Sequence, residues 1–446
     1  MSRFSGTLEK QYGIPTASLA NENIVAFGIG DHFKYSTGMP LRFVGVPYPF
    51  TGIAKEKLTD YLAGKDSVSG KPLMQAIADC LTKPLTVEEK KAGMPPEASA
   101  EPRFLQPDTE DNLQRLFKDK FWTDYNPIIL PTAERVAAML KGTSHKPDEL
   151  VKKESGTFGT TRPFTVEKVA IISVMAGAKP EYLPVILALS SQIPYMDSTT
   201  SNATFALVNG PIRKQIGMNS GIGALGPNGE ANSIIGRSMV LMHKILQGYR
   251  EGVSGFSSLS NPLAYSYMPI AENEEALPEG WKPIHVQNGF KPDDSVVTLF
   301  TGWNFVNCSG SVVEHYAPQL LMRDFTRVLA AMGSATLIMD PSVAKLLENT
   351  QGFQTKEALS EWLSKNAETT AGMYWANSIA SGMMGPMGKQ GLEPYSSWQK
   401  ASPDTLIKHL PNARNIRTIV VGGATASVWF ITDFMAGRGA SIDAWK

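Results

Sequence analysis

Three side chains with acid, base or nucleophile chemistry stand out in this chain: Glu272, Cys308 and His315. Glu272 opens an acidic group within a segment rich in proline and aromatic residues. Acidic runs usually form solvated loops, but a carboxylate beside apolar rings has the raised proton affinity that a general acid or base requires. We therefore treat Glu272 as a candidate proton-transfer group.

Cys308 and His315 follow a predicted strand at Ser295 to Phe300. Ser311 and Glu314 have capping-box spacing, which predicts a helix that starts near Ser311, just after Cys308. A thiol at that position would feel the positive end of the helix, which lowers its pKa and favours the reactive thiolate. In the alternative interpretation, Cys308 fills a gap in the core and His315 bonds a neighbouring carbonyl.

A glycine-rich segment, Asn209 to Arg237, connects a predicted strand at Thr204 to Val208 with a helix whose apolar residues recur from Ile235 to Tyr249. Glycines let backbone N–H groups approach a ligand, and the start of the helix offers its positive dipole end. We predict that this segment holds the anionic group of a small organic molecule. The residues expected to bind this substrate are Asn209, Arg213, Asn219, Ser220, Gly221, Gly223, Asn273 and Asn307.

The stretch Gly221 to Gly226 also fits the dinucleotide pattern G-x-G-x-x-G. That pattern requires the glycines to lie directly between strand and helix. Here Asn209 to Ser220 separate the strand from Gly221, and Pro227 precedes the helix. The spacing disfavours a nicotinamide cofactor, and the sequence identifies no other.

Composition narrows the choice of partners. The 446 residues carry 42 lysines and arginines against 42 aspartates and glutamates, so no net charge would attract nucleic acid or an anionic membrane. Two cysteines, Cys80 and Cys308, cannot build a disulfide framework, and no apolar run of signal-peptide or membrane-spanning type occurs. We expect a cytoplasmic protein whose partners are a small-molecule substrate and other subunits of a homo- or hetero-oligomer.

The elements that must position these groups alternate between strands and helices, which predicts an α/β fold with mostly parallel sheets flanked by helices and a small N-terminal domain. We place this α/β domain at residues 1–91 and a Pro- and Ala-rich linker at 92–107. The main α/β domain is expected at 108–446. Its recurring strand-helix unit hints at two related halves, 108–290 and 291–446.

Five separated phrases resemble the long form of the UGSC-type selenoprotein-related family. They are TDYNPIILPTAERVAAML, TVEKVAIISVMAGAKPEYLPV, VNGPIRKQIGMNSGIGALGP, ANSIIGR and IAENEE, and RFVGVPYPF is similar to the end of that family's small domain. The chain has no Cys-containing counterpart of the U-G-S-C motif, and Ala178 stands where many relatives are expected to have cysteine. The resemblance therefore implies a fold and pocket residues but no particular reaction and no thiol redox chemistry.

These observations favour an enzyme of lyase or hydrolase type that acts on a small anionic organic molecule. Glu272 and His315 would move protons, and Cys308 could act as a nucleophile. One alternative is a non-catalytic ligand-binding or scaffolding subunit of a larger complex. Another is a metal-dependent enzyme that uses His315 and the carboxylates from Glu272 to Glu275.

Overall fold

The computed structural model describes residues 2–22, 25, 40–47, 54–91, 103–152, 163–194, 200–249, 257, 259–309, 317–329 and 332–446. His315, the predicted helix start at Ser311 and most of the predicted linker lie outside the described residues. Helices and strands are mixed, so the α/β prediction is confirmed in that general sense.

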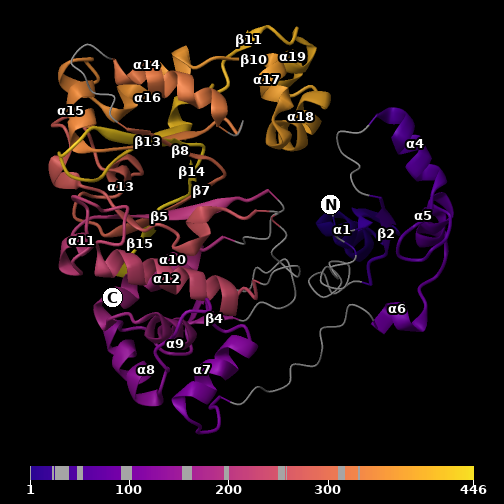
Figure 1. Ribbon diagram of the computed structural model, residues 1–446, viewed down its shortest axis with the longest axis horizontal. Coiled ribbons are helices and arrows are strands. Elements are labelled where there is room, and N and C mark those ends of the chain that lie inside the picture. Colours follow the sequence, from indigo (N-terminus) through magenta and orange to yellow (C-terminus); the bar gives the residue numbers. More distant parts are fainter. Residues whose placement is uncertain are drawn as a thin grey trace.

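Two sheets lie face to face with helices on their outer sides (Figure 1). The first sheet has the order β14 (Met435–Ala436), β7 (Val296–Gly302), β5 (Ala203–Asn209), β6 (Ile270–Ala271), and β15 (Ala440–Ser441) also pairs with β7. The second sheet has the order β12 (Ile416–Val420), β9 (Ala335–Met339), β13 (Val428–Thr432), β8 (Phe305–Ser309).

Alternating side chains on the strands divide the core into layers. In β5, Phe205 and Leu207 point between the two sheets, whereas Ala206 and Val208 point toward the helices below. The Phe205 ring stacks on Phe300 with centroids 4.7 Å apart and on Phe434 at 5.4 Å. The inner faces of both sheets are therefore joined by a common apolar layer.

The outer face of the first sheet is covered by α9 (Val166–Ala176), α10 (Leu183–Gln192) and α12 (Glu230–Ile245). The sequence predicts a helix that Thr165 opens and Gly177 closes, and in α9 Thr165 is the N-cap and Gly177, with a left-handed φ of 90°, is the C-cap. The outer face of the second sheet is covered by α14 (Pro318–Phe325), α15 (Pro341–Asn349) and α16 (Lys356–Asn366). The sequence predicts helices at Pro341 to Asn349 and at Lys356 to Asn366, and α15 and α16 have these bounds.

Smaller elements complete the chain. Those of the N-terminal stretch are α1 (Ser2–Tyr12), β1 (Ser18–Asn21), β2 (Phe43–Val46), α4 (Lys55–Ala63), α5 (Leu73–Thr82) and α6 (Val87–Lys91). Those around the first sheet are α7 (Glu110–Asp119), α8 (Ala133–Met139), β3 (Leu150–Lys152), β4 (Phe164–Thr165), α11 (Ile212–Gln215) and α13 (Ile284–Gln287). A side cluster contains β10 (Thr369–Thr370), α17 (Ala371–Ala376), α18 (Gly385–Lys389), α19 (Tyr395–Lys400) and β11 (Leu406–Ile407).

Two expectations about the fold are wrong. Among the described strands, three pairings are parallel and seven antiparallel, so the sheets are not mostly parallel. After Gly422 and Gly423 the sequence predicts a helix through Phe434, but this segment forms strand β13, because its β-branched and aromatic residues pack well on a pleated surface. The first sheet contains strands from both sides of residue 290, since β7 pairs with β5 along seven residues and β14 and β15 return to β7.

Candidate functional site

Asn209 and Glu272 lie side by side at the carboxyl ends of two parallel strands. β5 and β6 pair Val208 with Ala271, so the next residue of each strand comes to the same edge. Asn209 Nδ2 donates a hydrogen bond of 2.6 Å to Glu272 Oε2, and both residues are fully buried. The structure thus brings together two residues that the sequence singled out.

Glu272 has a cationic partner that the sequence analysis missed. Lys356 Nζ lies 2.6 Å from Glu272 Oε1, and the two side chains are 1% and 0% exposed. The Ile284 N–H also donates to Glu272 Oε2 at 2.9 Å. Lys356 is the first residue of α16, so its positive charge lies at the positive end of the helix dipole, which is unfavourable. The Glu272 carboxylate compensates for this repulsion and for the cost of burying the Lys356 charge.

Arg213 extends this network toward the surface. Its guanidinium donates to the backbone oxygens of Gly210 and Glu272 at 3.0 and 2.6 Å. It also lies 2.9 Å from a Glu274 carboxylate oxygen and 3.1 Å from Glu275 Oε1. Burial would raise the pKa of Glu275, but hydrogen bonds from Arg213 and Lys214 lower that pKa to about 2.

We call Asn209, Arg213, Glu272, Glu274, Glu275 and Lys356 the ion cluster. His285 adjoins it: its Nε2 lies 3.3 Å from the Pro292 oxygen and its Nδ1 lies 3.9 Å from Glu274 Oε1. In the described part of the chain, His285 Nδ1 and Asn209 Oδ1 are buried without a hydrogen-bond partner. One polar atom of the ion cluster and one atom beside it are therefore without a hydrogen bond, while the charges of the cluster are paired.

A second feature, the glycine pocket, lies where the glycine-rich segment meets the second sheet. This cavity of about 240 Å³ adjoins the carboxyl ends of β9 and β12 and the start of β13. Its walls are formed by Ile222, Gly223, Ala224, Leu225, Gly226, Ile338, Met339, Asp340, Val421, Gly422, Gly423, Thr425, Ala426, Val428 and Phe430. Such an edge is where open α/β sheets commonly bind ligands.

Close backbone contacts hold the glycine-rich segment against the sheet. The Gly422 N–H donates to the Ser220 oxygen at 2.8 Å, and Asn219 shares two hydrogen bonds with Asn232 of α12. A Cβ on Gly423 would come within 2.3 Å of Ile222, so a side chain there would force the segment away. Asn273 Nδ2 donates to the Gly422 oxygen at 3.0 Å and so connects the pocket wall to the ion cluster.

The charges around the glycine pocket differ from the expected anion site. Within the described residues Asp340 is the single charged wall residue, and its carboxylate accepts backbone N–H bonds from Ser342, Val343 and Val428 at 2.7, 3.1 and 2.5 Å. Arg213, expected to bind the substrate anion, is paired with carboxylates of its own chain. The pocket therefore offers backbone groups, a carboxylate and a hydroxyl, but no cation from the described residues.

The structure separates Cys308 from Glu272. Cys308 lies within strand β8, opposite Trp429, and packs with it toward the helices on the outer face of the second sheet. β8 and β12 are opposite edges of that sheet, three strand spacings or roughly 14 Å apart. Glu272 lies near the β12 edge, because the N–H of the next residue, Asn273, donates to the Val420 oxygen of β12. Asn307 pairs with Phe430, a glycine-pocket residue, and is exposed. The predicted joint action of Cys308 and Glu272 is therefore not supported.

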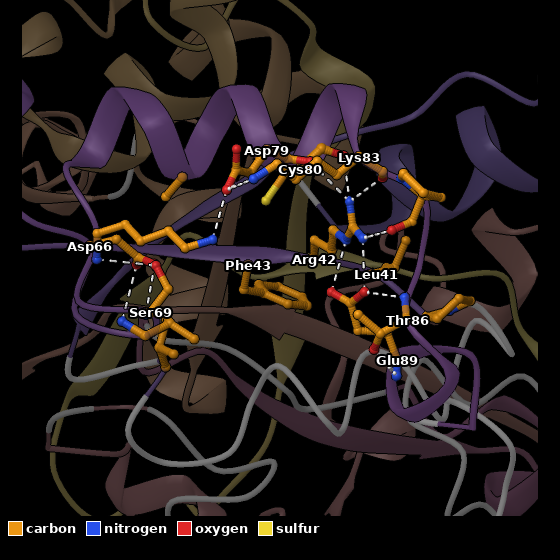
Figure 2. A pocket seen from close by; sticks show the side chains of 16 residues that line it. Leu41, Arg42, Phe43, Asp66, Ser69, Asp79, Cys80, Lys83, Thr86 and Glu89 are labelled. Carbon is orange, nitrogen blue, oxygen red and sulfur yellow. Dashed lines mark hydrogen bonds and ion pairs between the residues drawn. The ribbon is translucent and has the colours of Figure 1, made fainter.

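A separate cavity of about 470 Å³ lies among the N-terminal elements (Figure 2). Arg42 dominates it, with a two-pronged ion pair to Glu89 at 2.9 and 2.8 Å and bonds to backbone oxygens of Asp79 and Lys83 at the end of α5. A guanidinium at the end of a helix satisfies its last carbonyls and its dipole. Burial raises the pKa of the neighbouring Cys80 thiol, which disfavours the reactive thiolate. We therefore interpret the contacts in this cavity as structural.

The described residues lack two features that other functions would require. No group of three or more His, Cys, Asp or Glu side chains is arranged to hold a metal ion. No described helix has the length and apolar character needed to cross a membrane. A comparison with models of protein families and with curated proteins finds no match.

Lys356 and Asp340, which the sequence analysis did not name, stand in local sequence patterns that indicate their roles. Lys356 stands in the first turn of a helix capped by Thr355, where a cation is unfavourable, so a buried acidic partner could have been expected. Asp340 follows a strand that is apolar apart from Thr336 and precedes Pro341, which is the pattern of an N-cap at the carboxyl edge of a sheet. His285 carried no comparable signal.

Proposed function

We propose that this chain is an enzyme of lyase or hydrolase type that binds a small polar organic molecule in the glycine pocket and acts on it by proton transfer. The observation that carries the proposal is the junction of the glycine-rich segment with the carboxyl ends of β9 and β12, because it places a buried carboxylate, Asp340, at the wall of a cavity. Backbone N–H groups of the glycine-rich segment and the Thr425 hydroxyl would orient the ligand.

The ion cluster has a supporting role in this proposal. It fixes Asn273, which holds the Gly422 oxygen and thus one wall of the pocket. Glu272 is fully buried and paired with Lys356, so we assign it a positioning role in place of the proton-transfer role expected from sequence. The cluster would keep the edges of the two sheets at a fixed separation.

A variant that fills the glycine pocket tests whether a ligand binds there. Ala426 lines the pocket and is exposed, so Ala426→Trp would fill the cavity without disturbing the core. Ala424→Trp is the matched control, because Ala424 is also exposed and lies outside the pocket wall. A library of small polar molecules is screened by thermal shift. Ligands should raise the melting temperature of the wild type and the control but not of Ala426→Trp; equal shifts in all three would refute the site.

A second candidate is a non-catalytic ligand-binding subunit, and one observation favours it. The Asp340 carboxylate already accepts three backbone hydrogen bonds, which suits a structural cap. Asp340→Asn separates the candidates once a ligand is known. An enzyme should lose its turnover with ligand affinity largely kept, whereas a binding subunit shows no turnover in the wild type either.

We infer three further properties that rest on sequence. Two of the five phrases that resemble the UGSC-type family, VNGPIRKQIGMNSGIGALGP and ANSIIGR, form the glycine-rich segment and the start of α12, which supports a related pocket. A cytoplasmic setting fits a chain with two cysteines. A small N-terminal domain is supported by the separate apolar cluster of Val44, Val46, Leu73 and Ala76, and oligomer formation remains a proposal to be tested by light scattering.

A further inference from the structure

A larger cavity of about 590 Å³ lies away from the glycine pocket, between α7, α9, the end of α12 and residues 103–107. Its walls are mainly apolar and include Phe104, Leu105, Trp122, Leu130, Ile171 and Met175. Phe104 is 65% exposed, and Ile171 and Trp122 are half-buried, although they pack at the edge of the main apolar core. We call this cavity the apolar pocket.

The charged residues of the apolar pocket are all cations. Arg103, Lys120 and Lys168 line it, and no acidic residue of the described chain does. The Arg103 guanidinium lies 2.5 Å from a Glu167 oxygen just outside the wall, so the cations of the wall adjoin one carboxylate. Because Glu167 precedes Lys168 at the start of α9, Arg103 and Lys168 share one end of the pocket.

The apolar wall continues from that cationic end along α9. Ile171 and Ile172 follow Lys168 by one helical turn, and Met175 follows by two, which is roughly 10 Å along the helix axis. A ligand with a negative head and an apolar tail would match this order of side chains. The volume also lies within the range of roughly 300–1,000 Å³ that is typical of small-molecule sites.

We propose that the apolar pocket binds a single-chain alkyl carboxylate, with the carboxylate near Arg103 and Lys168 and the alkyl chain along Ile171 and Met175. This site is independent of the proposed function at the glycine pocket. It shares no wall residue with that pocket, so either proposal can fail alone.

Calorimetric titration of the full chain with octanoate, decanoate and dodecanoate tests whether the apolar pocket binds the alkyl chain. Affinity should rise about fourfold for each added methylene until the cavity is full. Ala133→Trp should abolish binding, because Ala133 is exposed and lines the pocket. Equal affinity for all three acids, or binding of dodecanoate unaffected by Ala133→Trp, would overturn the proposal.

Recognition of the carboxylate is tested with the variant Lys168→Met and with 1-dodecanol, which has no carboxylate. Loss of one cation should weaken dodecanoate binding roughly tenfold and leave dodecanol binding unchanged. Lys118→Met is the matched control on α7, since Lys118 lies outside the pocket, and it should bind dodecanoate like the wild type. Circular dichroism establishes that each variant is folded. Binding to phosphatidylglycerol vesicles without binding of free dodecanoate would instead identify a membrane-docking surface and refute the proposal.

Discussion

Lys356 Nζ and Glu272 Oε1 lie 2.6 Å apart in the interior, although the two residues are 84 positions apart in sequence. The pair joins the first residue of α16, on the second sheet, to the end of β6 in the first sheet. A buried charge left without its partner is strongly destabilising, so this contact ties the two layers together.

The first prediction concerns that pair. Glu272→Gln leaves Lys356 buried without a counter-charge and should lower the free energy of unfolding by about 3–5 kcal/mol, measured by urea denaturation. Adding Lys356→Met should recover part of the loss, because the uncompensated charge disappears. Glu361→Gln is the control in the same helix, since its pair with Lys365 spans 3.9 Å between exposed side chains, and it should change stability by less than about 0.5 kcal/mol. Additive losses in the double variant would contradict the coupling.

The second prediction concerns Gly210, whose φ is 85° and whose N–H donates to Glu274. A Cβ there would come within 2.2 Å of the Asp294 oxygen, so Gly210→Ala combines a clash with left-handed strain and should cost about 3 kcal/mol or more. Gly217→Ala is the matched control, with a φ of 67° and open space around its Cβ, and should cost about 1–2 kcal/mol. Equal losses in chemical denaturation would argue against the close contact.

The third prediction concerns pH. Burial lowers the pKa of His243 and of His409 from 6.5 to about 4. As the pH falls below about 6.5, the unfolded chain binds these protons before the folded one, so stability is lost down to pH 4, by about 3 kcal/mol for each histidine. His409→Gln should therefore show a flatter dependence of unfolding free energy on pH between 7 and 4 than the wild type.

His145 provides a control of opposite sign. The hydrogen bond that His145 Nδ1 donates to the Glu149 carboxylate raises the pKa of His145, so its contribution to stability is present below pH 6.5 and is lost as the pH rises through the folded-state value. His145→Gln should lower stability at pH 5.5 and have little effect at pH 8. The same pH profile for His145→Gln and His409→Gln would show that burial does not control the His409 pKa.

The fourth prediction concerns Asp340, which caps α15 and also accepts the Val428 N–H. Asp340→Ala removes the cap and a connection to β13, so it should cost about 2–3 kcal/mol in thermal or urea unfolding. Thr109→Ala removes the exposed cap of α7 and should cost about 1 kcal/mol. If both variants lose the same amount, the contact with β13 contributes no stability.

Local sequence alone determined much of the secondary structure. Thr165 and Gly177 mark the ends of α9, and the predicted bounds of α15 and α16 match, because caps and apolar periodicity act over a few residues. Sequence also identified Asn209, Arg213, Glu272 and Asn273, which the structure brings together around one edge of the first sheet.

Only the tertiary structure decided which charges meet and which cavities form. Asp340 and the glycine-rich segment share a pocket because β9 and β12 end beside it, and Cys308 is turned away because β8 is the opposite edge of the same sheet. Strand order and direction depend on contacts between distant parts of the chain, and a local pattern of side chains carries little information about them. The sequence therefore provides the chemical groups, and the pairing of the strands selects those that can act together.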